Sequence, residues 1–98
     1  MEGVQLKQNE NGEGTFYIME GKKQVGELVV GIEGKILTAY HTEVSPEAEG
    51  KGLAKQLVAA MAEYAKENQL QVIPRCSYVH AQFKRHPQEY NDLWKKEE

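Results

Sequence analysis

Three side chains in this sequence have the chemistry for nucleophilic or acid–base catalysis. Cys76 is the only cysteine among 98 residues and lies at the end of an expected strand. Its thiolate would be a strong nucleophile if the pKa of the thiol were lowered. His41 and Glu43 lie two residues apart in another expected strand and therefore share a face, where either could accept a proton from an amine. The alternatives are a small buried hydrophobe for Cys76 and a structural, hydrogen-bonded histidine for His41.

Other residues that could do chemistry form no convincing set. His80 and His86 do not combine with Cys76 at a spacing typical of a metal site, so we expect no metal. Tyr78 could donate a proton, but aromatic packing is the more usual use of a tyrosine beside a helix. Trp94 is expected to hold the last segment against the body of the protein.

A glycine-punctuated loop joins an expected strand to an expected helix. Gly50 and Gly52 allow sharp turns and a close approach of the backbone to a ligand. The first N–H groups of a helix lack intrahelical partners and carry partial positive charge, so such a junction favours an anion, above all phosphate. The spacing is also compatible with a simple tight turn.

The elements that must position these residues follow from hydrophobic periodicity. β-forming residues separated by Gly- and Asn-containing turns predict strands over residues 4–7, 15–19, 24–32 and 35–44. Apolar residues at i, i+4 and i+8 predict a helix over 52–68. A strand over 71–76, a helix over 78–85 and a short terminal helix over 89–96 complete the order β-β-β-β-α-β-α.

This order predicts an α/β (α+β) fold, with a mixed, mostly antiparallel sheet. The first strands form an antiparallel meander, and the strand–helix–strand unit forms a right-handed crossover that makes its two strands parallel. Ligands of such sheets bind at the carboxyl ends of the parallel strands, where the glycine loop lies. We expect residues 1–98 to form a single domain.

Composition restricts the class of protein. The net charge of −3, with positive and negative residues interspersed, argues against general nucleic-acid binding. No apolar run approaches the roughly 18 residues of a membrane helix, and the N-terminus lacks a signal-peptide core. A lone cysteine excludes an internal disulfide. We expect an intracellular, cytoplasmic protein without membrane or specific nucleic-acid partners.

Four segments together resemble the GNAT superfamily of N-acetyltransferases, and most closely its small single-domain branch, often called YjdJ-type. The resemblance covers most of the chain, from about residue 14 to residue 90. It is carried by His-Thr-Glu-Val at 41–44, Glu-Gly-Lys-Gly-Leu-Ala at 49–54, Val-Ile-Pro-Arg-Cys-Ser-Tyr-Val at 72–79 and His-Pro at 86–87.

The resemblance implies that acetyl-CoA is the cosubstrate. The superfamily's pyrophosphate loop reads Arg/Gln-x-x-Gly-x-Gly/Ala, so Gly52 and Ala54 match it and Glu49 stands where Arg or Gln is usual. Pantetheine would lie along the strand before the loop. The expected cofactor-binding residues are Thr42, Val44, Glu49, Gly50, Lys51, Gly52, Leu53 and Ala54. Phe83 falls at about the position of the tyrosine general acid of larger members, so that acid is expected to be absent.

The resulting hypothesis is an acetyl-CoA-dependent N-acetyltransferase with Cys76, His41 and Glu43 as catalytic residues. Cys76 would either take the acetyl group transiently or protonate the departing thiolate. The acceptor is left open between a small amine and a protein lysine. The rival hypotheses are an acyl-CoA-binding module with little or no activity and an interaction domain without a cofactor.

Overall fold

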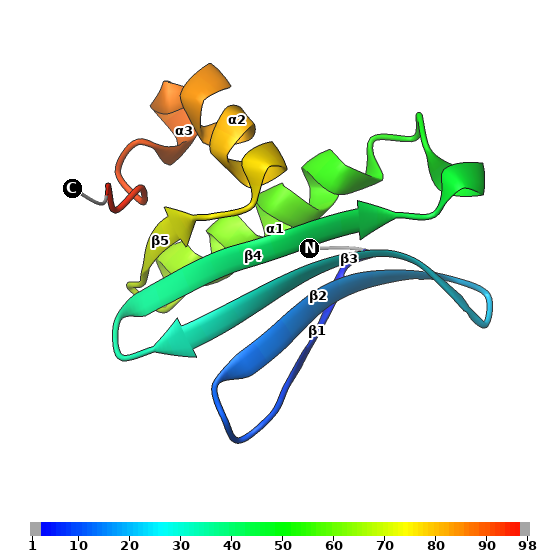
Figure 1. Cartoon of the computed structure of the whole chain (residues 1–98), viewed down its shortest axis with the longest axis horizontal. Helices are drawn as coiled ribbons and strands as arrows, with labels where there is room; N and C mark the ends of the chain where they lie inside the picture. Colours follow the sequence, from blue (N-terminus) through cyan, green and yellow to red (C-terminus); the bar gives the residue numbers. More distant parts are fainter. Residues whose placement is uncertain (1–2, 97–98) are drawn as a thin grey trace.

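The computed structural model describes residues 3–96, which form one mixed sheet and its helices (Figure 1). In chain order the elements are β1 (Gln5–Gln8), β2 (Glu13–Glu20), β3 (Lys23–Glu33), β4 (Ile36–Val44), the 3-10 helix η1 (Pro46–Ala48), α1 (Leu53–Glu67), β5 (Gln71–Pro74), α2 (Ser77–Arg85) and α3 (Pro87–Tyr90). The predicted order of the strands and of the first two helices is thus confirmed, and α3 lies near the short terminal helix that was predicted. Among the described residues, no helix is long and apolar enough to cross a membrane.

The sheet has the order β1-β2-β3-β4-β5, as expected from a meander followed by one crossover. The first four strands pair antiparallel, and β5 pairs parallel with β4. Gly21 and Gly34 turn the two long hairpins with φ of 62° and 61°, a left-handed conformation that glycine adopts at little cost. Helix α1 makes the crossover between β4 and β5, which confirms the predicted fold class.

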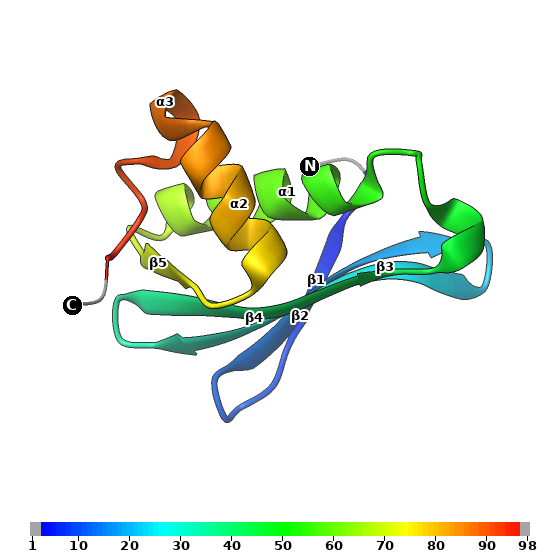
Figure 2. The same cartoon turned by 45° about the horizontal axis from the view of Figure 1, so that its top comes forward.

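The two faces of the sheet differ in what covers them. Figures 1 and 2 show α1 and α2 on the same side. The side chains facing these helices are buried, among them Phe16, Leu28 and Leu37 at 3%, 0% and 0% exposure. The apolar stripe of α1 packs on them through Leu57 and Met61, both fully buried. The alternate side chains of the strands are half-buried or exposed, so the opposite face is uncovered within the described residues.

A bulge interrupts β4 at Tyr40. Val29 pairs with His41 while the next residue, Val30, pairs with Ala39, which leaves Tyr40 without a partner on β3. A bulge bends its strand and increases the local twist. It lies directly after the last pair between β4 and β5, Ala39 with Pro74. The two parallel strands therefore separate at this point.

The C-terminal segment corrects one prediction. The helix expected over 89–96 is wrong: α3 spans Pro87–Tyr90, a turn follows over residues 91–93, and Trp94 forms an isolated bridge with Val72. Pro87 begins α3 because a proline at the first helical position loses no hydrogen bond. Val72 of β5 donates its N–H to the Leu93 carbonyl and accepts from the Lys95 N–H, both at 2.8 Å. The segment thus covers the outer edge of β5.

Phe83 anchors this end of the molecule. Its ring is fully buried, stacked on Tyr90 at 4.8 Å between centroids and edge-on to Trp94 at 6.0 Å. Trp94 also contacts the His80 ring at 5.3 Å. The prediction that Trp94 holds the last segment is thereby confirmed.

We expect Phe83→Ala to lower the free energy of unfolding by about 3–5 kcal/mol, because it leaves a cavity among three aromatic rings. The measurement is urea denaturation followed by circular dichroism. Phe83→Leu is the control and should cost about 1.5 kcal/mol or less, since it keeps most of the volume. A loss below 1 kcal/mol for the alanine variant (roughly the average for any substitution) would show that the aromatic cluster is not an anchor.

Candidate active site

The glycine loop presents free backbone donors at the start of α1. Gly50 and Gly52 have φ of 87° and 76°, and a Cβ at either would meet nothing within 4 Å. Gly52 is the N-cap of α1 and provides no side-chain cap, and the first helical turn holds no acidic residue. The first N–H groups of the helix therefore have no side-chain cap there, and the space beside the two glycines is open. This is the geometry of an anion site.

A pocket of about 280 Å³ lies between this loop and α2. Its lining includes six of the eight residues expected to bind a cofactor, Thr42 and Lys51 being the exceptions. The lining residues are Val44, Ala48, Glu49, Gly50, Gly52, Leu53, Ala54, Lys55 and Tyr78.

Tyr78 brings a hydroxyl to this pocket from the first turn of α2. Burial raises the pKa of Tyr78 above its ordinary value, and the positive charge of Arg85 only partly opposes this. The hydroxyl thus keeps its proton at neutral pH and can donate it. Phe83, at the position where the resemblance suggested a general acid, lies instead in the core.

Two ion pairs connect the loop to the β2–β3 hairpin. Lys51 Nζ lies 3.2 Å from Glu20 Oε2, and Lys23 pairs with Glu47. All four side chains are about half exposed, so each pair contributes little stability. The side chain of Lys51, expected to bind a cofactor, is therefore engaged elsewhere, whereas Glu49 is exposed and lines the pocket.

Cys76 lies where β4 and β5 separate. It caps the start of α2, and its N–H donates to the Ala39 carbonyl at 2.8 Å. Its side chain is buried, with Sγ in a hydrogen bond of 3.2 Å with Thr42 Oγ1. The thiol therefore lies on the helix-covered side of β4, next to the unpaired edge of that strand.

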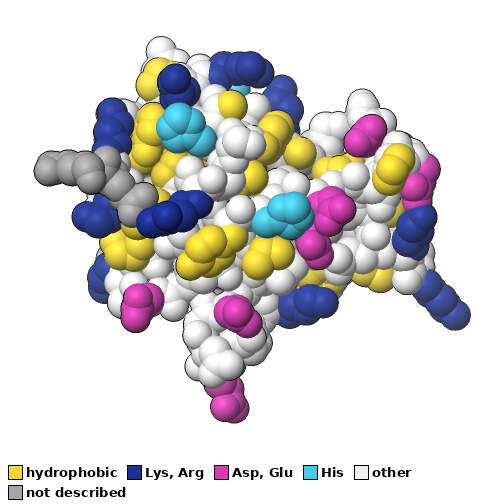
Figure 3. Space-filling model, in the orientation of Figure 1, with side chains coloured by type: hydrophobic (Ala, Val, Ile, Leu, Met, Phe, Trp, Pro, Cys, Tyr) yellow, Lys and Arg dark blue, Asp and Glu magenta, His cyan; other side chains and the backbone are white. Residues whose placement is uncertain are grey.

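His41 and Glu43 project from the opposite side of β4. His41 Nε2 is 3.4 Å from Glu43 Oε1, which confirms that the two side chains share a face. Their side chains are 58% and 70% exposed. Figure 3 views this face and shows a histidine beside acidic side chains near its centre. The sequence grouped Cys76 with His41 and Glu43, but the structure places them on opposite sides of one strand.

Glu27 completes this cluster and was missed by the sequence analysis. It pairs directly with Glu43 across β3 and β4, and one ligand atom of each of Glu27, His41 and Glu43 lies within 4.8 Å of the others. These are atoms that can hold a metal ion, so the expectation of a site without metal stays a prediction. Only the strand register could have revealed Glu27, because 14 positions separate it from His41 in the chain.

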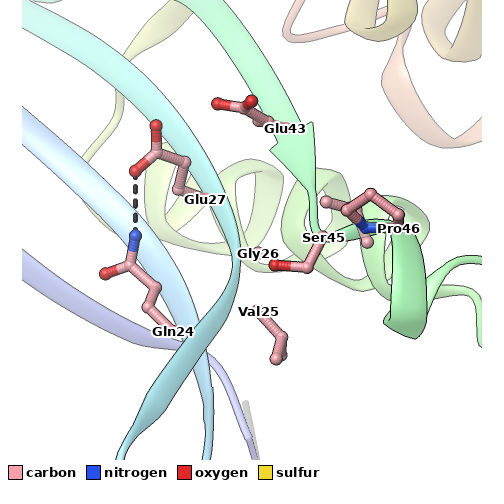
Figure 4. Close-up of a pocket in the computed structure, with 8 residues that line it drawn as sticks. Gln24, Val25, Gly26, Glu27, Glu43, Ser45 and Pro46 are labelled. Atoms are coloured by element: carbon pink, nitrogen blue, oxygen red, sulfur yellow. Dashed lines mark hydrogen bonds between the residues drawn. The ribbon is translucent and has the colours of Figure 1, made fainter.

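A pocket of about 210 Å³ lies beside the two glutamates, at the end of β4 (Figure 4). Figure 4 shows the Glu27 carboxylate accepting a hydrogen bond from Gln24, whose Nε2 is 2.9 Å away. The rest of the lining includes Ser45 and Pro46. Two carboxylates on directly opposed residues repel each other unless a cation or proton lies between them. The arrangement suits a positively charged ligand.

Comparison with known proteins gives the family of this site. The model of the GCN5-related N-acetyltransferase family matches residues 15–93, which include every candidate residue named above. A GCN5-like protein from Staphylococcus aureus, solved by NMR, is 32% identical, with a TM-score of 0.68. That alignment covers 100% of this chain and 94% of the other. The narrower YjdJ-type branch stays a prediction.

More distant structures share the fold. An aminoglycoside acetyltransferase from an uncultured soil metagenomic sample, in complex with sisomicin, is 18% identical with a TM-score of 0.64. The PaiA N-acetyltransferase of Thermoplasma acidophilum, in complex with coenzyme A, is 12% identical with a TM-score of 0.60. The alignments cover 92% and 74% of this chain, which spans only 64% and 48% of those two proteins.

Substitutions at Gly52 test whether the loop binds the phosphates of coenzyme A. Asn and Asp have nearly the same shape and both tolerate the left-handed backbone, so they differ here mainly in charge. We expect Gly52→Asp to weaken coenzyme A binding at least tenfold, about 1.4 kcal/mol, relative to Gly52→Asn. Isothermal titration calorimetry measures both affinities. Equal affinities would place the phosphates elsewhere.

Proposed function

This chain belongs to the GCN5-related N-acetyltransferase family, and we propose that it transfers the acetyl group of acetyl-CoA directly to an amine. One observation carries the proposal: within the described residues 3–96, the edge of β4 beyond Ala39 has no partner strand, with a thiol on one side and a histidine–glutamate cluster on the other. Such an edge can pair with an extended ligand through backbone groups while the two sides supply acid and base.

The pyrophosphate of acetyl-CoA would be held by backbone N–H groups of the loop. The donors are those of Gly50, Lys51, Gly52, Leu53 and Ala54. Thr42 and Val44 would then contact pantetheine along the open edge of β4. The thioester would reach the point where β4 and β5 separate, close to Cys76.

His41 is the proposed base. Its exposed imidazole can accept a proton from an amine, and Nε2 lies 3.4 Å from Glu43 Oε1. The amine nitrogen attacks the thioester carbonyl carbon, the carbon–sulfur bond breaks, and the amine gives its proton to His41. The thiolate of CoA leaves and takes up a proton, which Cys76 or Tyr78 can donate. The products are the acetamide and free CoA.

Cys76 is better placed for this proton transfer than for covalent catalysis. A nucleophilic thiol is usually activated by an adjacent base, but Sγ is hydrogen-bonded to the hydroxyl of Thr42, which is no base at neutral pH. His41 and Glu43 are on the other side of the strand. This separation supports direct transfer in a complex of both substrates.

We expect Cys76→Ala to retain coenzyme A binding and part of the activity, because CoA thiolate is a tolerable leaving group without an acid. No protein-bound acetyl group should appear when the wild type is incubated with acetyl-CoA. The measurements are thiol release and intact-protein mass spectrometry. Thr42→Val is the companion variant, since it removes the partner of Sγ and keeps the side-chain shape.

An adduct of one acetyl mass on Cys76, with activity abolished in Cys76→Ala, would show a covalent enzyme instead. Coenzyme A binding without turnover for any amine would favour the alternative, an acyl-CoA-binding module. Unchanged kinetics in both Cys76→Ala and Thr42→Val would leave the thiol a structural part of the core.

His41→Ala should reduce the rate most near neutral pH, because an imidazole that is already protonated in acid cannot accept the amine proton. An ordinary lysine amine, with a pKa near 10.4, is almost fully protonated at neutral pH and needs a base, whereas at higher pH more of it is free. The ratio of wild-type to variant rate should therefore fall as the pH rises above neutral. His80→Ala, which removes an exposed histidine of α2, is the control. A pH-independent ratio would argue against His41 as the base.

A further inference from the structure

A groove crosses the uncovered face of the sheet and begins where β4 and β5 separate. We call it the open-face groove; its volume is about 640 Å³. It is lined by Asn11, Gly12, Glu13, Gly31, Ile32, Glu33, Ile36, Thr38, Tyr40 and Ile73. Tyr40 lies next to His41 in the chain, so the groove leads directly away from the proposed base.

Tyr40 is the exposed aromatic of this groove. Among the described residues it is the one large hydrophobic residue with an exposed side chain, and 54% of its surface is accessible to solvent. Gly31 makes room for its ring: a Cβ there would lie only 2.9 Å from Tyr40 Cε2. The ring therefore lies across β3 rather than standing free. Exposed tyrosines held in place in this way are common anchors of protein–protein interfaces.

The reaction site is open on this face. Sites for small molecules usually bury most of the ligand surface in a cleft. Here the side chains of His41 and Glu43 are 58% and 70% exposed. A small free amine would gain little binding energy from so shallow a site. A longer acceptor would gain it by covering the groove.

The charges near the groove favour a basic acceptor. Both charged residues of its lining, Glu13 and Glu33, are acidic, and Glu27 and Glu43 flank the proposed base. The nearby cations Arg75, Lys95 and Lys96 line a separate pocket, which meets the groove at Ile73. Charge complementarity therefore directs basic residues across β3 toward the β1–β2 turn.

We propose that the acceptor amine is a lysine in an extended polypeptide whose neighbouring basic residues occupy the open-face groove. The inference rests on the acetyl transfer proposed above and names its acceptor class. The lysine amine reaches the open edge of β4 beside His41. The flanking chain covers Tyr40, and its arginines or lysines approach Glu33 and Glu13.

The test compares three acceptors with acetyl-CoA: capped lysine, a peptide with one lysine flanked by arginines, and the same peptide flanked by glutamates. Arginine provides charge without competing as an acceptor. We expect kcat/KM for the arginine peptide to exceed that for capped lysine by about tenfold or more, the equivalent of 1.4 kcal/mol. The glutamate peptide should be no better than capped lysine.

Variants locate the effect. Tyr40→Ala and Glu33→Lys should each lower kcat/KM for the arginine peptide several-fold. Both variants should keep kcat/KM for capped lysine within twofold of the wild-type value. Glu67→Lys makes the same charge change at an exposed position of α1. It is the matched control and should change kcat/KM for neither acceptor. Equal rates for peptide and capped lysine, or variants without effect, would overturn the inference while acetyl transfer stands.

A second readout does not depend on turnover. The arginine peptide with its lysine already acetylated should shift amide signals of residues 31–33 and 38–41 in ¹⁵N NMR titrations, and Glu33→Lys should reduce these shifts. Shifts without acetylation of any amine would support the groove and overturn the proposed function. No shifts at these residues would overturn the groove, whatever the activity.

Discussion

The pairing of β4 with β5 ends after four residues, and the site depends on that break. Pro74 has no N–H to donate and occupies the last paired position. A proline there ends the ladder without breaking a hydrogen bond inside it. The bulge at Tyr40 bends β4 at the same point. The Cys76 N–H then holds the start of α2 on the Ala39 carbonyl at 2.8 Å. Three local features thus fix where the strands part, and the remainder of β4 is left with an open edge.

The same bulge decides which side chains lie on which side of β4. One extra residue reverses the alternation beyond it, so Thr42 faces the helices with Cys76, while His41 and Glu43 face away. A strand without the bulge would point His41 and Glu43 at α1 and α2 and remove them from solvent. A single unpaired residue therefore places Cys76, the proposed proton donor, and His41, the proposed base, on opposite sides of the open edge.

Most of the fold was predictable because its signals are local. Turn glycines and β-forming runs gave the meander, and the i, i+4 stripe of α1 gave the crossover. The terminal helix over 89–96 was wrong because its apolar residues make tertiary contacts: Leu93, at the end of a turn, and Trp94, in an isolated bridge, lie at the edge of β5. Glu27 could not be found, since it joins His41 only through strand register, and register combines residues that are distant in sequence. For the same reason the sequence did not predict that Cys76 and His41 lie on opposite sides of β4.

The loop before α1, which is proposed to bind phosphate, has no net positive side-chain charge. Lys51 and Lys23 are paired with Glu20 and Glu47, and the exposed Glu49 remains near the backbone donors. Side-chain charge in the loop is thus balanced or negative, so in the proposed site the attraction for phosphate would come from oriented N–H groups at the helix start and from Lys55, an exposed lysine that lines the same pocket. Such groups act over a short range and need a close approach, which Gly50 and Gly52 permit because neither presents a side chain. The two glycines therefore both turn the chain and leave space beside the backbone for an anion.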